Sequence, residues 1–328
     1  MAMRPPASSS SFRWQKPRPL HRRLPPLLLL LVSAASFLLA LAFARAAAAG
    51  LLRHANSFGR RCSPEGYVGE EAEAAAAQQQ RRRPRIAMVS FSDEAEGGGR
   101  LRSFRGVGEA VAGNKRSYAG GMGYRYVDAR KLVDPGRPPS WSKILAVQSL
   151  LPRYDWVFWN DADTMVMNPS ISLESILHAA IGHMDFDKAP DLVVTEDTNG
   201  VNAGVFFVRR SKWSERFLQI WWNETSFIQF GSTKSGDNDA LKHLIYGLSE
   251  EELQAHVAIS PMQCLFNSYP WIPTLKSVLR LLASPKATWN GVYSDGDFLL
   301  HLAGVDDKRK WVANLIEEMH TVWPMKEK

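Results

Sequence analysis

The chain has 328 residues, of which 45% are hydrophobic and 22% are charged, as is typical of a globular protein with one large domain and appendages. The formal net charge of +7 is unevenly distributed: the first 85 residues carry 14 Lys and Arg against 4 Asp and Glu, whereas the remainder carries 26 against 29. Because the basic charge belongs to the N-terminal segment, the main domain has no composition that supports nucleic-acid binding.

The N-terminal segment has the pattern of a membrane anchor. Residues 1–24 are basic, and residues 25–44, PPLLLLLVSAASFLLALAFA, contain no charge and are long enough to span a bilayer. Because the basic flank precedes the apolar run, we expect a cytoplasmic tail, a transmembrane signal anchor and a lumenal domain, the topology of a single-pass type II membrane protein. A cleaved signal peptide and an organellar transit peptide are the alternatives.

Residues 45–84 are rich in Ala, Gln, Glu and Arg and poor in large apolar residues, so we expect a disordered lumenal stem before a folded domain at residues 85–328. The two cysteines are Cys62 in this stem and Cys264 in the domain. One intramolecular disulfide, an intermolecular bridge and two free thiols are all compatible with that count. Asn223 lies in an Asn-Glu-Thr sequon and is a candidate glycosylation site, consistent with a lumenal location.

Within the domain, short apolar runs alternate with helical segments. Strands are predicted at residues 86–91, 124–127, 157–159, 191–195, 202–208 and 298–304, and helices at residues 104–119 and 213–222 and after residues 140, 168 and 235. Ser140 is expected to cap its helix, and residues 202–208 are expected to begin as a loop. The alternation predicts a mostly parallel α/β sheet flanked by helices. No GxGxxG motif follows the first strand, so the sequence gives no support for a dinucleotide-binding Rossmann domain.

The segment YDWVFWNDAD, residues 154–163, joins an aromatic strand to two carboxylates. A strand of this kind is covered on both faces of a parallel sheet, and its carboxyl end is where ligands bind in open α/β folds. Asp161 and Asp163 could be two solvated loop aspartates, but charges beside such a buried segment need a partner or a metal. His301, in the apolar run at residues 298–304, is the leading third ligand for Mn²⁺ or Mg²⁺.

Five motifs follow one another along the domain: NKRSYAGGMGY at residues 114–124, the DAD-containing segment at 139–169, NAGVFFVRRSKWS at 202–214, GDNDAL at 236–241 and HLAG at 301–304. Together they resemble the Golgi glycosyltransferase family that includes plant xyloglucan xylosyltransferases, galactomannan galactosyltransferases and fungal α-mannosyltransferases, over roughly residues 86–312. The resemblance implies a GT-A fold and transfer of a hexose or pentose from a UDP- or GDP-sugar to a glycan or polysaccharide acceptor, with a metal ion and with retention of configuration.

The resemblance also implies roles for individual residues. Asp161, Asp163 and His301 match the metal ligands. Asp237 and Asn238 match a catalytic Asp-Gln pair, with Asn in place of Gln; capping of a helix is the alternative for Asp237. The positions that match donor-binding residues are Lys115, Tyr118, Lys143, Asn202, Gly204, Gly304 and Lys308, the last of which replaces a Cys-Lys that usually follows the HLAG glycine.

Two other functions compete with glycosyl transfer. DADT also fits the DxDxT pattern of phosphohydrolases, with Asp161 as nucleophile and Asp163 as acid, although at least two strands precede it here. A non-catalytic lumenal scaffold of a transferase complex is the other alternative. The sequence leaves the donor sugar, the acceptor, the linkage and any homo- or hetero-oligomer open.

Overall fold

The computed structural model describes residues 26–60, 62, 64, 83–92, 106–183, 185–231 and 234–322. It divides into two units, residues 1–46 and residues 47–328. Helix α1 (Pro26–Arg53) is 28 residues long and contains a window of mean hydropathy 2.6, so its length and composition suffice to cross a membrane. This helix fits the expected single-pass anchor, whereas the basic tail at residues 1–24 lies outside the described residues.

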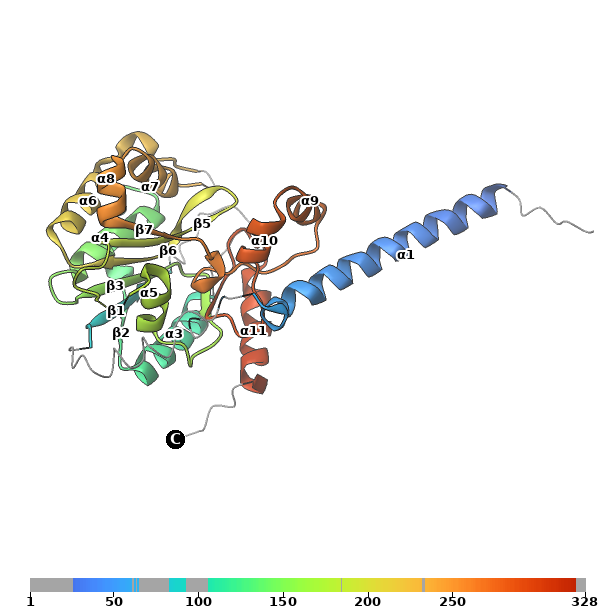
Figure 1. The fold of residues 1–328 in the computed structure, drawn as a ribbon, viewed down its shortest axis with the longest axis horizontal. Helices are drawn as coiled ribbons and strands as arrows, with labels where there is room; N and C mark the ends of the chain where they lie inside the picture. Colours follow the sequence, from blue (N-terminus) through green and yellow to red (C-terminus); the bar gives the residue numbers. More distant parts are fainter. Residues whose placement is uncertain are drawn as a thin grey trace, which may run out of the picture. The chain divides into compact units, whose positions relative to one another are not determined.

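A six-stranded sheet in the order β2-β1-β3-β6-β5-β7 forms the centre of the second unit (Figure 1). Its strands are β1 (Ile86–Ser90), β2 (Arg125–Asp128), β3 (Trp156–Asn160), β5 (Leu192–Asp197), β6 (Gly200–Arg209) and β7 (Val257–Ser260). The β1–β2, β1–β3 and β5–β7 pairs are parallel, and only β6 runs antiparallel to its neighbours β3 and β5. The mostly parallel α/β class predicted from the sequence is therefore confirmed, and residues 202–208 lie within β6 rather than in a loop.

Helices cover both faces of this sheet (Figure 1). Helices α4 (Ser142–Leu150), α6 (Lys212–Asn223) and α7 (Asp237–Tyr246) pack on one face, and α3 (Gly108–Met122) and α5 (Leu173–Ile181) on the other. Because side chains alternate along a strand, Val157 and Trp159 of β3 enter the first of these cores and Trp156 and Phe158 the second. All five residues of β3 are buried, as its uninterrupted apolar sequence predicts.

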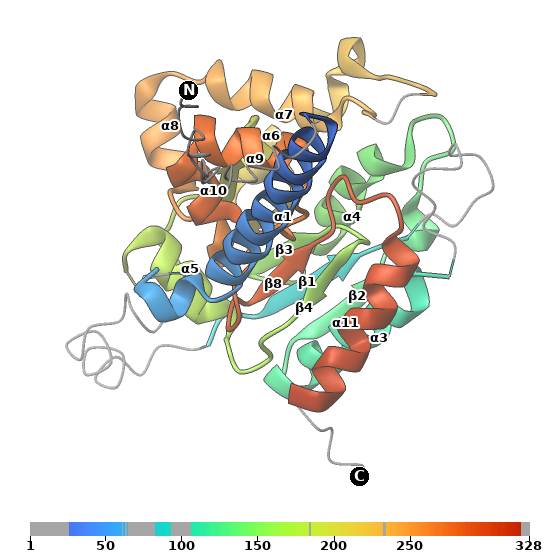
Figure 2. The same cartoon turned by 90° about the vertical axis from the view of Figure 1, so that its right-hand side faces the viewer.

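A second, two-stranded sheet forms from β4 (Thr164–Val166) and β8 (Leu299–His301). The strands are antiparallel and pair Thr164 with His301, which brings the histidine beside the residue that follows Asp163. A third apolar core joins this sheet to α3 and to α11 (Lys308–Val322), which Figure 2 shows next to each other. The remaining elements are α8 (Glu250–His256), α9 (Leu275–Ala283), α10 (Pro285–Gly291) and the 3₁₀ helices η1 (Ala55–Phe58), η3 (Arg130–Leu132), η4 (Pro139–Trp141), η5 (Thr225–Phe227) and η6 (Gln263–Leu265).

The first part of the expected stem is folded against the domain. We call residues 47–60 together with Cys62 the strap. The Arg60 side chain is fully buried, and its guanidinium donates two hydrogen bonds to the carboxylate of Asp297, at 2.8 and 2.6 Å. Asn56 Nδ2 donates to the same carboxylate at 2.8 Å. A low content of apolar residues predicts disorder, but here two polar side chains find buried partners more than 200 residues away.

A disulfide fixes the end of the strap. Cys62 is bonded to Cys264 in η6, with the two Cα atoms 5.7 Å apart, so the structure selects the intramolecular pairing that the sequence left open. Both cysteines are completely buried. Residues 65–82, which make up most of the rest of the expected stem, lie outside the described residues.

Candidate metal and donor site

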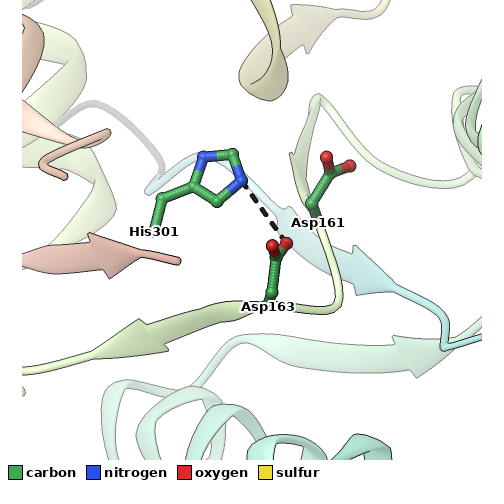
Figure 3. A group of neighbouring side chains, drawn as sticks. All are labelled: Asp161, Asp163 and His301. Carbon is green, nitrogen blue, oxygen red and sulfur yellow. Dashed lines mark ion pairs between the residues drawn. The ribbon is translucent and has the colours of Figure 1, made fainter. Parts of the chain in front are cut away.

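Asp161, Asp163 and His301 converge at the carboxyl end of β3 (Figure 3). Asp161 and Asp163 flank the turn between β3 and β4, and His301 ends β8. One ligand atom from each of the three side chains lies within 4.8 Å of the other two, and Nε2 of His301 is 3.4 Å from an oxygen of Asp163. Two carboxylates and one imidazole form a donor set that fits a divalent cation such as Mn²⁺, because hard carboxylate oxygens and a neutral imidazole nitrogen both suit this ion.

The ring of His301 is held in one orientation by Asn267. The Asn267 amide group donates to Thr195 Oγ1 at 3.0 Å and to Asn202 Oδ1 at 3.1 Å, so its own carbonyl oxygen accepts from Nδ1 of His301 at 2.8 Å. When the ring is neutral with Nδ1 protonated, Nε2 has the lone pair that would bind a metal ion. Asn267 was not predicted from the sequence, because a single Asn outside a recognisable motif gives no signal.

Gly204 of β6 provides the space that this ring occupies. A Cβ atom added at position 204 would stand 2.4 Å from Cε1 of His301 and 2.9 Å from Oδ1 of Asn202. The backbone carbonyl of Gly204 also accepts a hydrogen bond from the backbone amide of Asp161 at 2.8 Å. The glycine therefore fixes two of the three candidate ligands, one by its missing side chain and one by its backbone.

Lys308, the first residue of α11, reaches Asp163 and forms a buried ion pair with it. Burial alone raises the pKa of the Asp163 carboxyl, but His301 and Lys308 outweigh it and hold that pKa well below its usual range. Asp163 is therefore ionised at neutral pH and is available as an anionic ligand. The structure thus places Lys308 against Asp163, and its predicted contact with a donor stays a prediction.

Lys143 connects the metal cluster to Asp237. Its ammonium group lies 3.2 Å from Asp161 and 2.9 Å from Asp237, and it donates to the carbonyl of Ala203 at 3.0 Å. Burial lowers the pKa of Lys143, but Asp161 and Asp237 more than offset this, so the pKa lies above its ordinary value. Lys143 is consequently a charged, buried residue in α4 and not a solvated helix residue.

Asp237 is held by three hydrogen-bonding side chains. Besides Lys143, its carboxylate accepts from Ser140 Oγ at 2.9 Å and from Ser235 Oγ at 2.7 Å. Ser140 therefore does not cap α4 as expected, because it lies in η4 and donates to Asp237 instead. Asp237 is the first residue of α7, and no side chain caps that helix. The Asp237 carboxylate instead contacts Lys143, Ser140 and Ser235.

Asn202 and Asn238 hold the backbone of β6 in place. Asn238 Oδ1 accepts from the amide of Ala203 at 2.6 Å, and Asn202 Oδ1 accepts from the amide of Gly204 at 2.8 Å. Asn202 Nδ2 donates to the hydroxyl of Tyr269 at 2.8 Å. Both asparagines therefore support the strand that carries Gly204.

The other predicted residues lie at different distances from the cluster. Lys115 Nζ donates to the backbone carbonyl of Asp161 at 2.7 Å, and burial lowers the pKa of Lys115 to about 7. Tyr118 lies apart from the cluster, because its buried ring packs in the α3–α5 core and its hydroxyl donates to the carbonyl of Ile171 at 2.8 Å. Gly304 is exposed in the connection from β8 to α11, and the Asn223 side chain is exposed at the end of α6.

A shallow hollow lies beside the cluster at the carboxyl ends of β1 and β2. It is lined by residues that include Ser90, Lys115, Asp128 and Ala162, the residue between the two aspartates. The mostly parallel α/β sheet, with an aspartate pair and a histidine at this edge and a lysine-lined hollow beside them, agrees with the GT-A fold that the five motifs imply.

Residues 82–311 match the galactosyl transferase GMA12/MNN10 family. The chain belongs to this family of glycosyltransferases. This match confirms the family resemblance that the five motifs predicted. It argues against the alternative that the DADT segment belongs to a phosphohydrolase.

Curated relatives come from fungi and plants. The chain is 24% identical to the probable alpha-1,6-mannosyltransferase MNN10 of Saccharomyces cerevisiae, over 73% of this chain and 68% of the relative. It is 23% identical to an alpha-1,2-galactosyltransferase of Schizosaccharomyces pombe, over 60% of this chain and 56% of the relative. It is 28% identical to the probable glycosyltransferase 6 of Oryza sativa subsp. japonica, over 52% of this chain and 38% of the relative. The match thus covers from about a third to two thirds of these relatives.

Similar solved structures include two glycosyltransferases. One is involved in the glycosylation of the major capsid of PBCV-1; the similarity has a TM-score of 0.46 at 14% identity and covers 72% of this chain and all of that one. The other is the galactosyltransferase LgtC in complex with donor and acceptor sugar analogues, with a TM-score of 0.40 at 16% identity, covering 74% of this chain and 98% of that one.

Proposed function

We propose that this protein is a metal-dependent glycosyltransferase that moves a hexose or pentose from a UDP- or GDP-sugar to a glycan or polysaccharide acceptor, with retention of configuration. The observation that carries the proposal is the convergence of Asp161, Asp163 and His301 at the carboxyl end of β3. Lys143 and Lys308 lie directly against these acids, so the site also offers cations for an anionic diphosphate.

We assign a separate role to each of these side chains. Asp161, Asp163 and His301 would hold Mn²⁺ or Mg²⁺, which, when bound, neutralises the charge on a nucleotide diphosphate leaving group. Lys308 pairs with Asp163 and is assigned to the diphosphate. Asp237, held by Lys143, is assigned to the donor sugar, and Lys115 holds the backbone of Asp161 next to the hollow assigned to the nucleotide.

We further propose that the protein is a single-pass type II membrane protein of the Golgi. Residues 1–24 would be the cytoplasmic tail, residues 25–44 the anchor and residues 85–328 the lumenal catalytic domain. Two observations support a lumenal domain: the Cys62–Cys264 disulfide, which persists in oxidising compartments, and the exposure of Asn223 in its sequon. Among the described residues of the expected stem, both the strap and Arg83, which donates a hydrogen bond to Glu174 at 2.6 Å, contact the domain.

The proposal is tested with the full-length protein in detergent. A panel of nucleotide sugars is titrated with and without Mn²⁺, with binding followed by calorimetry and turnover by nucleotide release. Metal-dependent binding of one donor that is lost in Asp163→Asn is the expected result. Asp239→Asn is the matched control, because it makes the same substitution in α7, two residues after Asp237, at a side chain that is 41% exposed. Absence of any metal-dependent binding by folded protein would overturn the proposal.

A non-catalytic scaffold is the second candidate, and one observation favours it. Asn238 stands in place of the family's glutamine, and its carbonyl is engaged by the backbone of Ala203. A scaffold would still support its partner transferase after Asp163→Asn, whereas an enzyme would lose its own activity. Assaying partner activity with this variant separates the two functions.

A further inference from the structure

Helix α9 carries an apolar stripe that faces solvent. Leu275, Leu279 and Leu282 are 67%, 56% and 73% exposed, and their spacing of four and three residues places them on one side of the helix. Val278 borders this stripe and Leu281 lies farther round the helix, and both are partly buried. A soluble helix of this kind normally turns its leucines toward the protein, so the outward stripe indicates a surface that something else covers.

The charge around this stripe has one sign. Lys276 and Arg280 of α9 and Lys286 of α10 are exposed, and no Asp or Glu occurs from residue 275 to residue 294. A short apolar stripe flanked by basic side chains is the composition of a helix that lies in a membrane interface. A contact between two copies of this patch would instead bring like charges together.

The strap connects this surface to the membrane helix. Arg60 donates to the carbonyl of Trp289 in α10 at 2.9 Å, and α10 packs against α9. Helix α1 is continuous to Arg53, which pairs with Asp295, and Arg45 is the first charged residue after the apolar run. About eight helical residues from Arg45 to Arg53 span about 12 Å, so the chain itself keeps this part of the domain close to the bilayer surface.

The exposed apolar side chains of the domain are most frequent on two segments that both contact α10, namely α9 and the strap. Among the described residues from 47 onward, nine large hydrophobic side chains are exposed, and five of them lie on the strap or on α9. The five are Leu51, Phe58, Leu275, Leu279 and Leu282. Figure 2 turns the face with α9 and α10 toward the viewer. We propose that α9, with the strap beside it, rests on the surface of the membrane that holds α1, its leucines among the lipid tails next to the headgroups and its basic residues at the phosphates.

This inference rests on the membrane-anchor part of the proposed function and adds a second contact to it. An anchor alone leaves the domain free to rotate about the tether. A second contact through α9 fixes which side of the domain faces the bilayer.

The test places a fluorescent probe on α9 of the full-length protein. Leu279→Cys is labelled with the dye NBD, which is specific because Cys62 and Cys264 are bonded to each other. The labelled protein is reconstituted into phosphatidylcholine vesicles, with and without phosphatidylserine, and with or without a doxyl-labelled lipid that quenches the dye on contact. Phe230→Cys is the matched control, because this side chain is also large, apolar and 67% exposed but lies in the connection between α6 and α7.

The proposal expects that doxyl lipid lowers the emission at position 279 by about threefold or more and leaves position 230 nearly unchanged. Equal behaviour of the two positions would overturn it. So would a blue shift at position 279 that depends on protein concentration in detergent and not on lipid, since a second copy would then cover the stripe. Flotation of the vesicles after alkaline extraction reports on the anchor separately: protein that floats but shows no quenching refutes the α9 contact alone, and protein that does not float refutes the anchor.

Discussion

Replacing Gly204 by Ala should weaken metal binding, because the added Cβ meets the side chains of His301 and Asn202. The φ angle of Gly204 lies outside the left-handed range, so the backbone accepts alanine and the effect is steric. The new Cβ would stand 2.4 Å from Cε1 of His301, whereas carbon atoms pack at about 3.5 Å or more, so the ring has to move by about 1 Å. Metal ligands tolerate about 0.2 Å, so His301 could no longer share an ion with both aspartates.

Displacement of an oriented ligand costs about 10- to 100-fold in metal affinity, or about 1.4 to 2.7 kcal/mol. The assay is a titration of the full-length protein with Mn²⁺, in which electron paramagnetic resonance measures the free ion, so no substrate is needed. Gly121→Ala in α3 is the matched control, because a Cβ there meets no atom within 4 Å. That variant should bind Mn²⁺ normally and should gain about 0.4 to 1 kcal/mol of stability. Unchanged affinity in Gly204→Ala, within about twofold, would refute the assignment of His301 as a ligand.

Three further outcomes follow from the contacts. Asn267→Ala should reduce Mn²⁺ affinity by about 10-fold or more in the same titration, because the ligand histidine loses its orienting acceptor, and normal affinity would contradict this role. Replacing Cys62 and Cys264 together by Ala should lower the free energy of unfolding by up to about 5 kcal/mol, measured by denaturant titration, because the disulfide closes a loop of 202 residues. Two arginines and a backbone amide hold the pKa of Asp155 below its usual range despite burial, so its stabilising effect is present above pH 4 or so and is lost as the pH falls through the folded-state pKa. Melting temperatures of wild type and Asp155→Asn should therefore differ at pH 7 and converge in acid; a gap that stays constant with pH would show that the charge is not responsible.

Much of the fold could be predicted because its signals are local. Strand β3 consists of three aromatic residues and a valine before Asn160, and α6 has apolar residues at helical spacing, so both elements could be predicted from neighbouring residues. The direction of β6 was not readable in this way. A tight hairpin turns β5 back into β6, and residues 202–208, expected to begin as a loop, form part of that antiparallel strand.

The two aspartates of the candidate site could likewise be found from the sequence, since they follow a buried strand directly. The pairing of β4 with β8 decided that His301 joins them, because it sets Thr164 opposite the histidine. No local pattern indicated Asn267, which acts only through the ring that it touches. Tyr118 belongs to the motif that suggested donor binding, yet its hydroxyl is used inside the core.

Composition and periodicity by themselves determined the anchor-like helix, the alternating α/β architecture and the acidic pair, since these depend on hydrophobic burial and on residues close in sequence. The tertiary structure decided which polar side chains meet: the contact of His301 with Asp163, the pairing of Lys143 and Lys308 with the two aspartates, and the docking of the strap. Each of these depends on one polar side chain that contacts a buried partner far away in the sequence, as Arg60 contacts Asp297. A single contact of this kind produces no periodic pattern in the sequence.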